Sequence, residues 1–209
     1  MKKVALLTSA YFGPIQWYQK LCCYDTVYIE QHDSFVKQTY RNRCVIASAN
    51  GPLPLTVPIE RAADDIRISD HGNWRHVHRQ AVISAYGESP FFEFYADDIL
   101  PLFDQRWELL YDFNLAITRT MCRLLDIEPD IRLTPTYAPT GRGVPPYVSQ
   151  PAVVSDYRES IRPHHPQADA CFTPRPYYQV YSQRHGFLPN LSILDLLFNM
   201  GNESLLYLR

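Results

Sequence analysis

The chain opens with two short apolar runs separated by an amphipathic stretch. Residues 4–9 are almost continuously apolar, which is typical of a strand covered on both faces. A turn containing Gly13 and Pro14 leads into a helix predicted over about residues 15–24. Residues 26–30 have the β-branched and aromatic composition of a second strand. We expect these strands to be parallel neighbours joined by a right-handed crossover.

The pattern then changes to that of a hairpin. Apolar runs at residues 44–47 and 53–59 flank Asn50-Gly51, a dipeptide strongly preferred in tight hairpin turns. Residues 66–68 alternate between apolar and polar and predict a short edge strand. We therefore expect a mixed sheet that holds both parallel and antiparallel strands.

A helical middle section follows. Apolar residues recur with the period of a helix over residues 74–85, 91–100 and 106–125. Asn73 is placed to cap the first of these helices and Ser89 the second.

Residues 129–176 are rich in proline and have no long periodic run. Loops of this length are uncommon in compact domains unless they are lids, binding loops or disordered segments. We predict a short helix at 156–161, then an apolar helix at 193–198 that Gly201 ends. The whole pattern predicts one α/β domain over residues 1–209: an N-terminal strand–helix–strand with a mixed sheet, a β-hairpin, a helical middle section and a long proline-rich loop.

Composition and charge limit the classes of ligand and partner that the protein can bind. Of the 209 residues, 46% are hydrophobic and 20% charged, as in a folded globule. A net charge of −2 gives no basic field for nucleic acid. No apolar stretch approaches the roughly 20 residues that span a bilayer. The 17 prolines and 15 tyrosines favour ordered, aromatic-lined loops that suit sugar or nucleotide rings, although each tyrosine is also explained as a half-buried core residue.

The five cysteines include no CxxC pair, so neither a disulfide framework nor a metal site is indicated. Reduced thiols fit a cytoplasmic protein. The apolar run at the start ends too soon for a signal peptide and is interpreted as the first strand. The sequence identifies no cofactor.

The turn after the first strand is one candidate ligand site. Ligands of open α/β sheets bind beyond the carboxyl ends of strands, often at a helix N-terminus that favours anions. Tyr11 and Gln16 are therefore candidate binding residues. The turn has neither GxGxxG nor a P-loop, so an ordinary strand-to-helix turn is the alternative.

A cationic stretch follows the second strand. Lys37, Arg41 and Arg43, together with Asn42, can grip a phosphate or carboxylate, because guanidinium groups make paired bonds to such anions. The alternative is a solvated sheet edge.

The helix that begins with Trp74 supplies further candidates. His76 and His78 diverge by roughly 160° around a helix and are poor joint metal ligands. His78 borders the apolar stripe and is the candidate catalytic proton carrier, with Arg75 as an anion ligand. A hydrogen-bonded border histidine without chemistry is the alternative.

Two polar residues fall on apolar helix faces. We expect Asn114 to fasten another segment, with a ligand contact as the alternative, because a buried amide needs partners. Asp195 lies between leucines and is a candidate ligand-binding residue that pairs with a cation; otherwise it faces solvent.

Several of these segments together resemble the WbqC-like protein family: the opening strand and turn, residues 40–43, residues 55–59, Asn73–Arg75 with His78, and the terminal block at 187–198. The resemblance covers nearly the whole chain, and the terminal block is its most specific part. It implies a cytoplasmic bacterial protein, encoded in some members among genes for surface polysaccharide assembly. It also implies a transferase of nucleotide-linked or lipid-linked sugars, but no particular catalytic residue.

We therefore expect a transferase with an anionic small-molecule substrate such as a nucleotide-sugar, bound by Arg41, Arg43 and Arg75 near His78. The hypothesis requires these groups to converge on one pocket. The alternative is a non-enzymatic binding or scaffold protein that uses its aromatic and proline-rich segments as an interface. A homo-oligomer is compatible with both.

Overall fold

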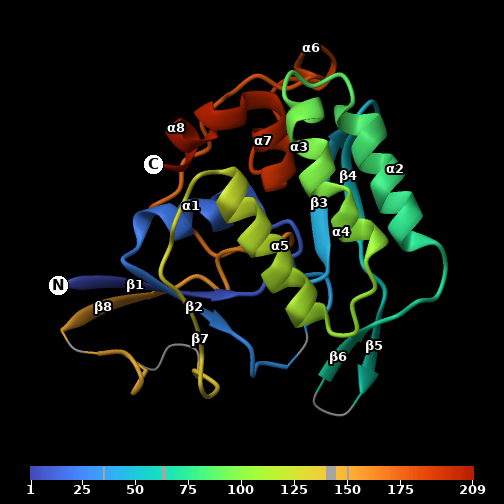
Figure 1. The fold of residues 1–209 in the computed structure, drawn as a ribbon. Helices are drawn as coiled ribbons and strands as arrows, with labels where there is room; N and C mark the ends of the chain where they lie inside the picture. Colours follow the sequence, from blue (N-terminus) through green and yellow to red (C-terminus); the bar gives the residue numbers. More distant parts are fainter. Residues whose placement is uncertain (35, 63–64, 140–144, 150) are drawn as a thin grey trace.

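A four-stranded parallel sheet forms the centre of the fold (Figure 1). Its strand order is β7-β2-β1-β8, with every neighbouring pair parallel. The strands are β1 (Lys2–Thr8), β2 (Thr26–Glu30), β7 (Ile131–Leu133) and β8 (Ala152–Asp156). The computed structural model describes residues 1–34, 36–62, 65–139, 145–149 and 151–209.

The expected α/β architecture and parallel β1–β2 pair are confirmed, and the antiparallel strands lie apart from the parallel sheet. One hairpin joins β3 (Arg43–Ser48) to β4 (Gly51–Thr56), and the other joins β5 (Ile59–Ala62) to β6 (Asp65–Ile68). The strands expected in one mixed sheet are thus divided among three sheets.

Helices cover one face of the parallel sheet, and most begin close to their expected positions (Figure 1). The longer ones are α1 (Ile15–Cys23), α2 (Trp74–Tyr86), α3 (Phe92–Ile99), α5 (Leu110–Leu124) and α7 (Ile193–Met200). Single turns form α4 (Pro101–Asp104), α6 (Ser182–His185), η1 (Gly201–Ser204) and α8 (Leu205–Leu208). The two predicted helix caps are wrong. Asn73 lies at the N-cap of α2 but its side chain makes no capping hydrogen bond, and the N-cap residue of α3 is Phe91, not Ser89.

The proline-rich segment differs most from expectation, because β7 and β8 both lie in it. The helix predicted over residues 156–161 is wrong: Asp156 ends β8, and a turn follows in which the Ile161 N–H donates to the Tyr157 carbonyl at 2.9 Å. Strands this short, flanked by prolines, carry too few residues for a period-two signal and are fixed by pairing with β1 and β2.

The same segment covers the second face of the parallel sheet. Ala5 and Leu7 of β1 face the main core, which is built with the helices. Val4 and Leu6 face the other side, where Ala138 and Val148 of the proline-rich segment pack against them. This double coverage explains why β1 is apolar at consecutive positions.

Helix α7, which precedes η1 and α8, is buried on all sides and is held at both ends. At its start, the Ser192 hydroxyl accepts from the Leu194 N–H and donates to the Phe12 carbonyl. At its end, Gly201 adopts φ +54°, and a Cβ there would lie 2.7 Å from the Phe91 ring. As predicted, Gly201 ends the helix.

Replacing Gly201 by alanine should therefore destabilise the protein through both backbone strain and a steric clash. Gly72→Ala is the matched control, because Gly72 has φ +72° but open space around its Cβ position. We expect a loss of about 1–2 kcal/mol for Gly72→Ala and at least about 1 kcal/mol more for Gly201→Ala, measured by urea unfolding. Equal losses would contradict the proposed contact with Phe91.

Candidate functional site

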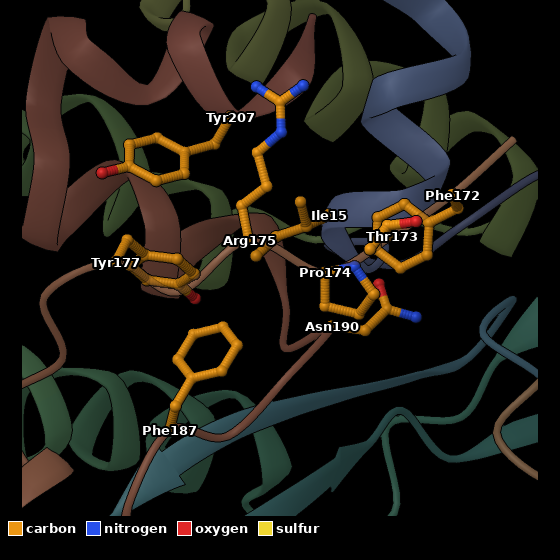
Figure 2. A pocket seen from close by; sticks show the side chains of 9 residues that line it. All are labelled: Ile15, Phe172, Thr173, Pro174, Arg175, Tyr177, Phe187, Asn190 and Tyr207. Carbon is orange, nitrogen blue, oxygen red and sulfur yellow. The ribbon is translucent and has the colours of Figure 1, made fainter.

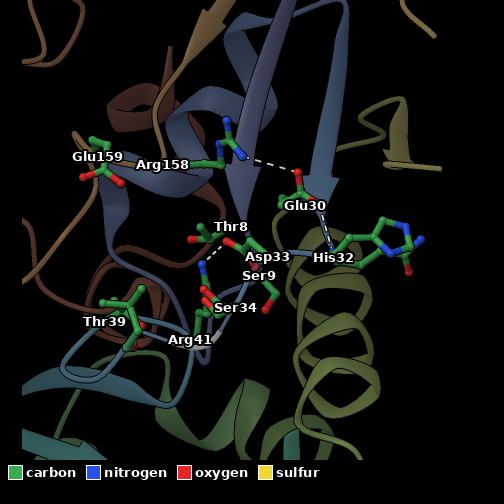
Figure 3. A network of polar contacts seen from close by, with 12 residues as sticks. Thr8, Ser9, Glu30, His32, Asp33, Ser34, Thr39, Arg41, Arg158 and Glu159 are labelled. Atoms are coloured by element: carbon green, nitrogen blue, oxygen red, sulfur yellow. Dashed lines mark hydrogen bonds and ion pairs between the residues drawn. The ribbon is translucent and has the colours of Figure 1, made fainter. Parts of the chain in front are cut away.

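The carboxyl ends of the four parallel strands carry a concentration of polar side chains (Figure 3). From β1 the chain adds β2 and then β7 on one side of β1, and it returns to add β8 on the other side. The order of the strands therefore reverses at β1. Ligands of open α/β sheets bind outside the strand ends at such a reversal. We call the following residues the strand-end cluster: Ser9, Glu30, Asp33, Arg41, Asp156, Arg158, Glu159 and Arg162.

Glu30, the last residue of β2, is the most buried carboxylate of the cluster, with a side chain 0% exposed. Its Oε1 accepts from the His32 N–H at 2.9 Å and the Thr134 hydroxyl at 2.8 Å. Its Oε2 accepts from the Ala138 N–H at 2.9 Å and from Arg158 at 3.3 Å. Both oxygens are therefore fully used inside the protein.

Arg158 follows β8 and links two carboxylates. Its Nε and Nη2 donate to the two oxygens of Asp156 at 2.9 and 2.7 Å, while Nη1 reaches Glu30. The Arg158 side chain is only 5% exposed. Its guanidinium group thus neutralises buried charge at the ends of β2 and β8.

Arg41 approaches the same strand ends from the segment before β3. It forms an ion pair with Asp33 and donates from Nη1 to the Ser34 carbonyl at 2.9 Å. Its Nε is buried and has no hydrogen-bond partner in the described part of the chain. Burial lowers the pKa of Arg41 and raises that of Asp33, whereas their ion pair opposes both shifts.

Arg162 is the most accessible guanidinium group of the cluster. It pairs with Glu159, and the two side chains are 29% and 34% exposed. Its Nε donates to the Arg158 carbonyl at 3.3 Å. Arg158 and Arg162 are near enough that their positive charges help to lower the pKa of Arg41.

Helix α5 closes one side of the site. The Asn114 Nδ2 donates to the Arg41 carbonyl at 2.8 Å and to the Ser9 hydroxyl at 3.2 Å, so Asn114 fastens two segments as expected. One turn earlier lies Tyr111. Burial raises the pKa of Tyr111, and the negative charges of Asp112 and Glu30 add to the effect. Neither the Asn114 Oδ1 nor the Tyr111 hydroxyl has a partner among the described residues.

The structure brings Tyr11 and His78 together. The Tyr11 hydroxyl lies 2.8 Å from the His78 Nδ1, and the imidazole ring packs edge-on against Trp74. Burial lowers the pKa of His78 to about 4, although a backbone hydrogen bond at Thr56 opposes the shift. His78 is therefore neutral at neutral pH and is held within an aromatic cluster.

The remaining sequence candidates are dispersed. Asn42 donates to the Val57 carbonyl, Arg43 donates to the Thr56 hydroxyl, and Lys37 is exposed. Arg75 pairs with Asp70 and stacks on Trp74. The three arginines thus have different partners: Arg41 bonds Asp33 and Ser34, Arg43 bonds Thr56, and Arg75 bonds Asp70.

Two candidates lie in the interior. The Gln16 side chain donates to Asp169 at 2.8 Å and accepts from Asn190 at 3.0 Å. Asp195 is 0% exposed and accepts from the Tyr177 hydroxyl at 2.5 Å and from Gln179 at 2.9 Å. Burial raises the pKa of Asp195 against the effect of these hydrogen bonds. The expected pairing of Asp195 with a cation is thus corrected: in the described part of the chain its side chain pairs with Tyr177 and Gln179.

Two hollows of the described part of the chain lie outside the strand-end cluster. An aromatic-walled pocket formed by Phe172, Tyr177, Phe187 and Tyr207 surrounds Arg175 (Figure 2), but its volume of about 10 Å³ accommodates no more than a water molecule. A hollow of about 480 Å³ lies beside α1, the start of β1, and Val153 and Ser155 of β8. The described residues contain no group of three or more His, Cys, Asp or Glu side chains placed to hold a metal ion.

Sequence reasoning located Arg41 and the first strand end but missed Glu30, Asp33, Arg158 and Arg162. Glu30 and Asp33 could have been identified from the sequence, because one acidic residue ends a buried strand and the other lies three residues later. Arg158 and Arg162 had none, since β8 was not recognised.

The fold and the strand-end cluster define an α/β protein with a parallel sheet and a polar site at its strand order reversal. The chain belongs to the WbqC-like protein family, whose model matches residues 9–207. It is similar to an uncharacterised protein of Mycobacterium tuberculosis, with 27% identity over 227 aligned positions that cover 100% of this chain and 98% of the relative. No solved structure matches the chain significantly.

Replacing Glu30 by glutamine should be costly, because the amide NH2 would face N–H donors from which the carboxylate now accepts, and Arg158 would lose one of its two acidic partners. We expect Glu30→Gln to lower the free energy of unfolding by about 3–5 kcal/mol, measured by urea denaturation at pH 7. Glu108→Gln, which removes an exposed partner of Arg67, is the control and should change it by less than about 1 kcal/mol. Similar values for both variants would contradict the central role of Glu30.

The depressed pKa of His78 predicts a loss of stability in acid. The unfolded chain binds a proton near pH 6.5 but the folded protein only near pH 4, so protonation favours unfolding as the pH falls between these values. The contribution should reach about 3 kcal/mol at pH 4. Unfolding measurements from pH 7 to pH 4 should show this loss of stability in the wild type and a smaller loss in His78→Gln. His76→Gln, on the exposed face of α2, should lose as much stability as the wild type.

Proposed function

We propose that the protein is a transferase that acts on an activated, nucleotide-linked or lipid-linked sugar in bacterial surface polysaccharide biosynthesis. Membership of the WbqC-like family supports this class of role. The strand-end cluster supports the location and the type of ligand. The observation that carries the proposal is the combination of guanidinium and carboxylate groups where the strand order reverses.

The charges of the cluster favour a ligand with both anionic and hydroxyl groups. Three guanidinium groups face four carboxylates, so the cluster is not a simple anion trap. Arg158 is already engaged by Asp156 and Glu30, whereas Arg41 keeps a buried Nε free and Arg162 is partly exposed. Phosphate oxygens accept from such N–H groups, and carboxylates accept from sugar hydroxyl or amino groups.

Within this proposal, Arg41 and Arg162 bind the phosphate. His78 reaches the first turn through the Tyr11 hydroxyl, and its role as proton carrier belongs to the proposal. Arg43 and Arg75 make their hydrogen bonds and ion pairs outside the cluster. We therefore assign them no direct contact with the phosphate.

Arg162→Ala tests the binding role with little risk to folding, because its partly exposed pair with Glu159 contributes no more than about 1 kcal/mol. We expect a panel of UDP-, dTDP-, GDP- and CMP-sugars to contain a ligand that raises the melting temperature of the wild type. Calorimetry should then show at least about tenfold weaker binding to Arg162→Ala, as for loss of a charge-assisted hydrogen bond.

The control is Arg123→Ala. Arg123 lies in the last turn of α5 and pairs with Asp98 of α3, so its loss should leave binding unchanged. Equal effects of the two substitutions would contradict the proposed site. The alternative function is a non-enzymatic scaffold, favoured by exposed apolar side chains such as Phe94 at 77% and Leu206 at 67%. A scaffold would bind no member of the panel and would show a stable oligomer or partner complex by sedimentation.

A further inference from the structure

We infer that Asp33 is the group of the strand-end cluster that recognises the sugar, through a hydrogen bond from a sugar hydroxyl or amino group to its Oδ1. This inference rests on the proposed function, because it divides one activated-sugar site into a phosphate side and a sugar side.

The first argument compares the four carboxylates. Glu30 accepts at both oxygens, and both oxygens of Asp156 are engaged by Arg158. Glu159 uses one oxygen for Arg162 and lies at the rim, 34% exposed. Asp33 uses Oδ2 for Arg41 and has a hydrogen bond from its own backbone, but no side chain of the described residues donates to its Oδ1. Asp33 is therefore the inner carboxylate with an oxygen available to a ligand.

The second argument is how firmly Asp33 is held. Its side chain is 17% exposed, compared with 0% for Glu30, so it is accessible without being mobile on the surface. The Arg41 guanidinium group bonds both the Asp33 carboxylate and the Ser34 carbonyl. In Figure 3 these groups lie beside Thr8 and Ser9, at the end of β1. A carboxylate fixed in this way loses little conformational entropy on binding.

The third argument is the spacing that an activated sugar imposes. Its phosphate is bonded to the anomeric carbon, so the groups that bind the phosphate and the ring hydroxyls must be neighbours. The ion pair of Asp33 with Arg41 provides this neighbourhood, and the buried Nε of Arg41 has no partner among the described residues. Burial also raises the pKa of Asp33, and a hydrogen bond from a ligand would restore part of the lost solvation.

Calorimetry with matched pairs of ligands separates the two sides of the site. Each nucleotide-sugar of the panel is compared with its nucleotide diphosphate, or monophosphate for CMP, against the wild type and Asp33→Asn. The amide keeps the size of Asp33 and an oxygen that can accept from Arg41. We expect Asp33→Asn to bind the nucleotide-sugar about tenfold or more weakly, while binding of the nucleotide alone is unchanged or slightly stronger.

Asp98→Asn, which changes the carboxylate paired with Arg123 outside the strand-end cluster, is the control and should not alter this difference. A melting temperature of Asp33→Asn close to that of the wild type confirms that the site is folded. An equal loss for both ligands of a pair, or no loss for either, would overturn the assignment of Asp33 while leaving the proposed function intact. Failure of the wild type to bind any pair would overturn the proposed function, and the inference with it.

Discussion

The buried carboxylate of Glu30 is the constraint on which the rest of the structure depends. A charge removed from water must find several donors, and here they come from the segments that follow β2, β7 and β8. Thr134 and Ala138 fix the start of the proline-rich segment, and Arg158 fixes the residues after β8. One side chain thus holds together the strand ends, the cover of the second sheet face and the wall of the candidate site.

Local patterns in the sequence were sufficient to predict the elements that carry their own signal. The run of β1, the composition of β2, the Asn50-Gly51 turn and the glycine at the end of α7 all have local physical causes. Strands β7 and β8 have three and five residues and are strands because β2 and β1 lie beside them, which no local window contains. The candidate site was only half predictable for the same reason, since Arg158 and Arg162 follow β8.

Several polar residues that seemed to offer chemistry prove to hold segments together. Gln16 and Asp195 fell within apolar stretches, and a polar residue in such a stretch indicates burial before it indicates a ligand. Gln16 connects α1 to Asp169, whereas Asp195 connects α7 to Tyr177 and Gln179. Asn114 combines both aspects. Its amide nitrogen fastens the Arg41 and Ser9 segments, and its Oδ1 has no partner among the residues that the structure describes.

The arginines of the strand-end cluster also differ in how far their hydrogen bonds hold segments of the protein together. The Arg158 guanidinium group is saturated by Asp156 and Glu30, so diverting it to a phosphate would expose the buried charge of Glu30. Arg162 lies outside that network, and its contacts can change without disturbing the strand ends. The bonds that hold the strand ends are therefore separate from the ion pair of Arg162, and prolines nearby restrict the conformations open to this part of the chain.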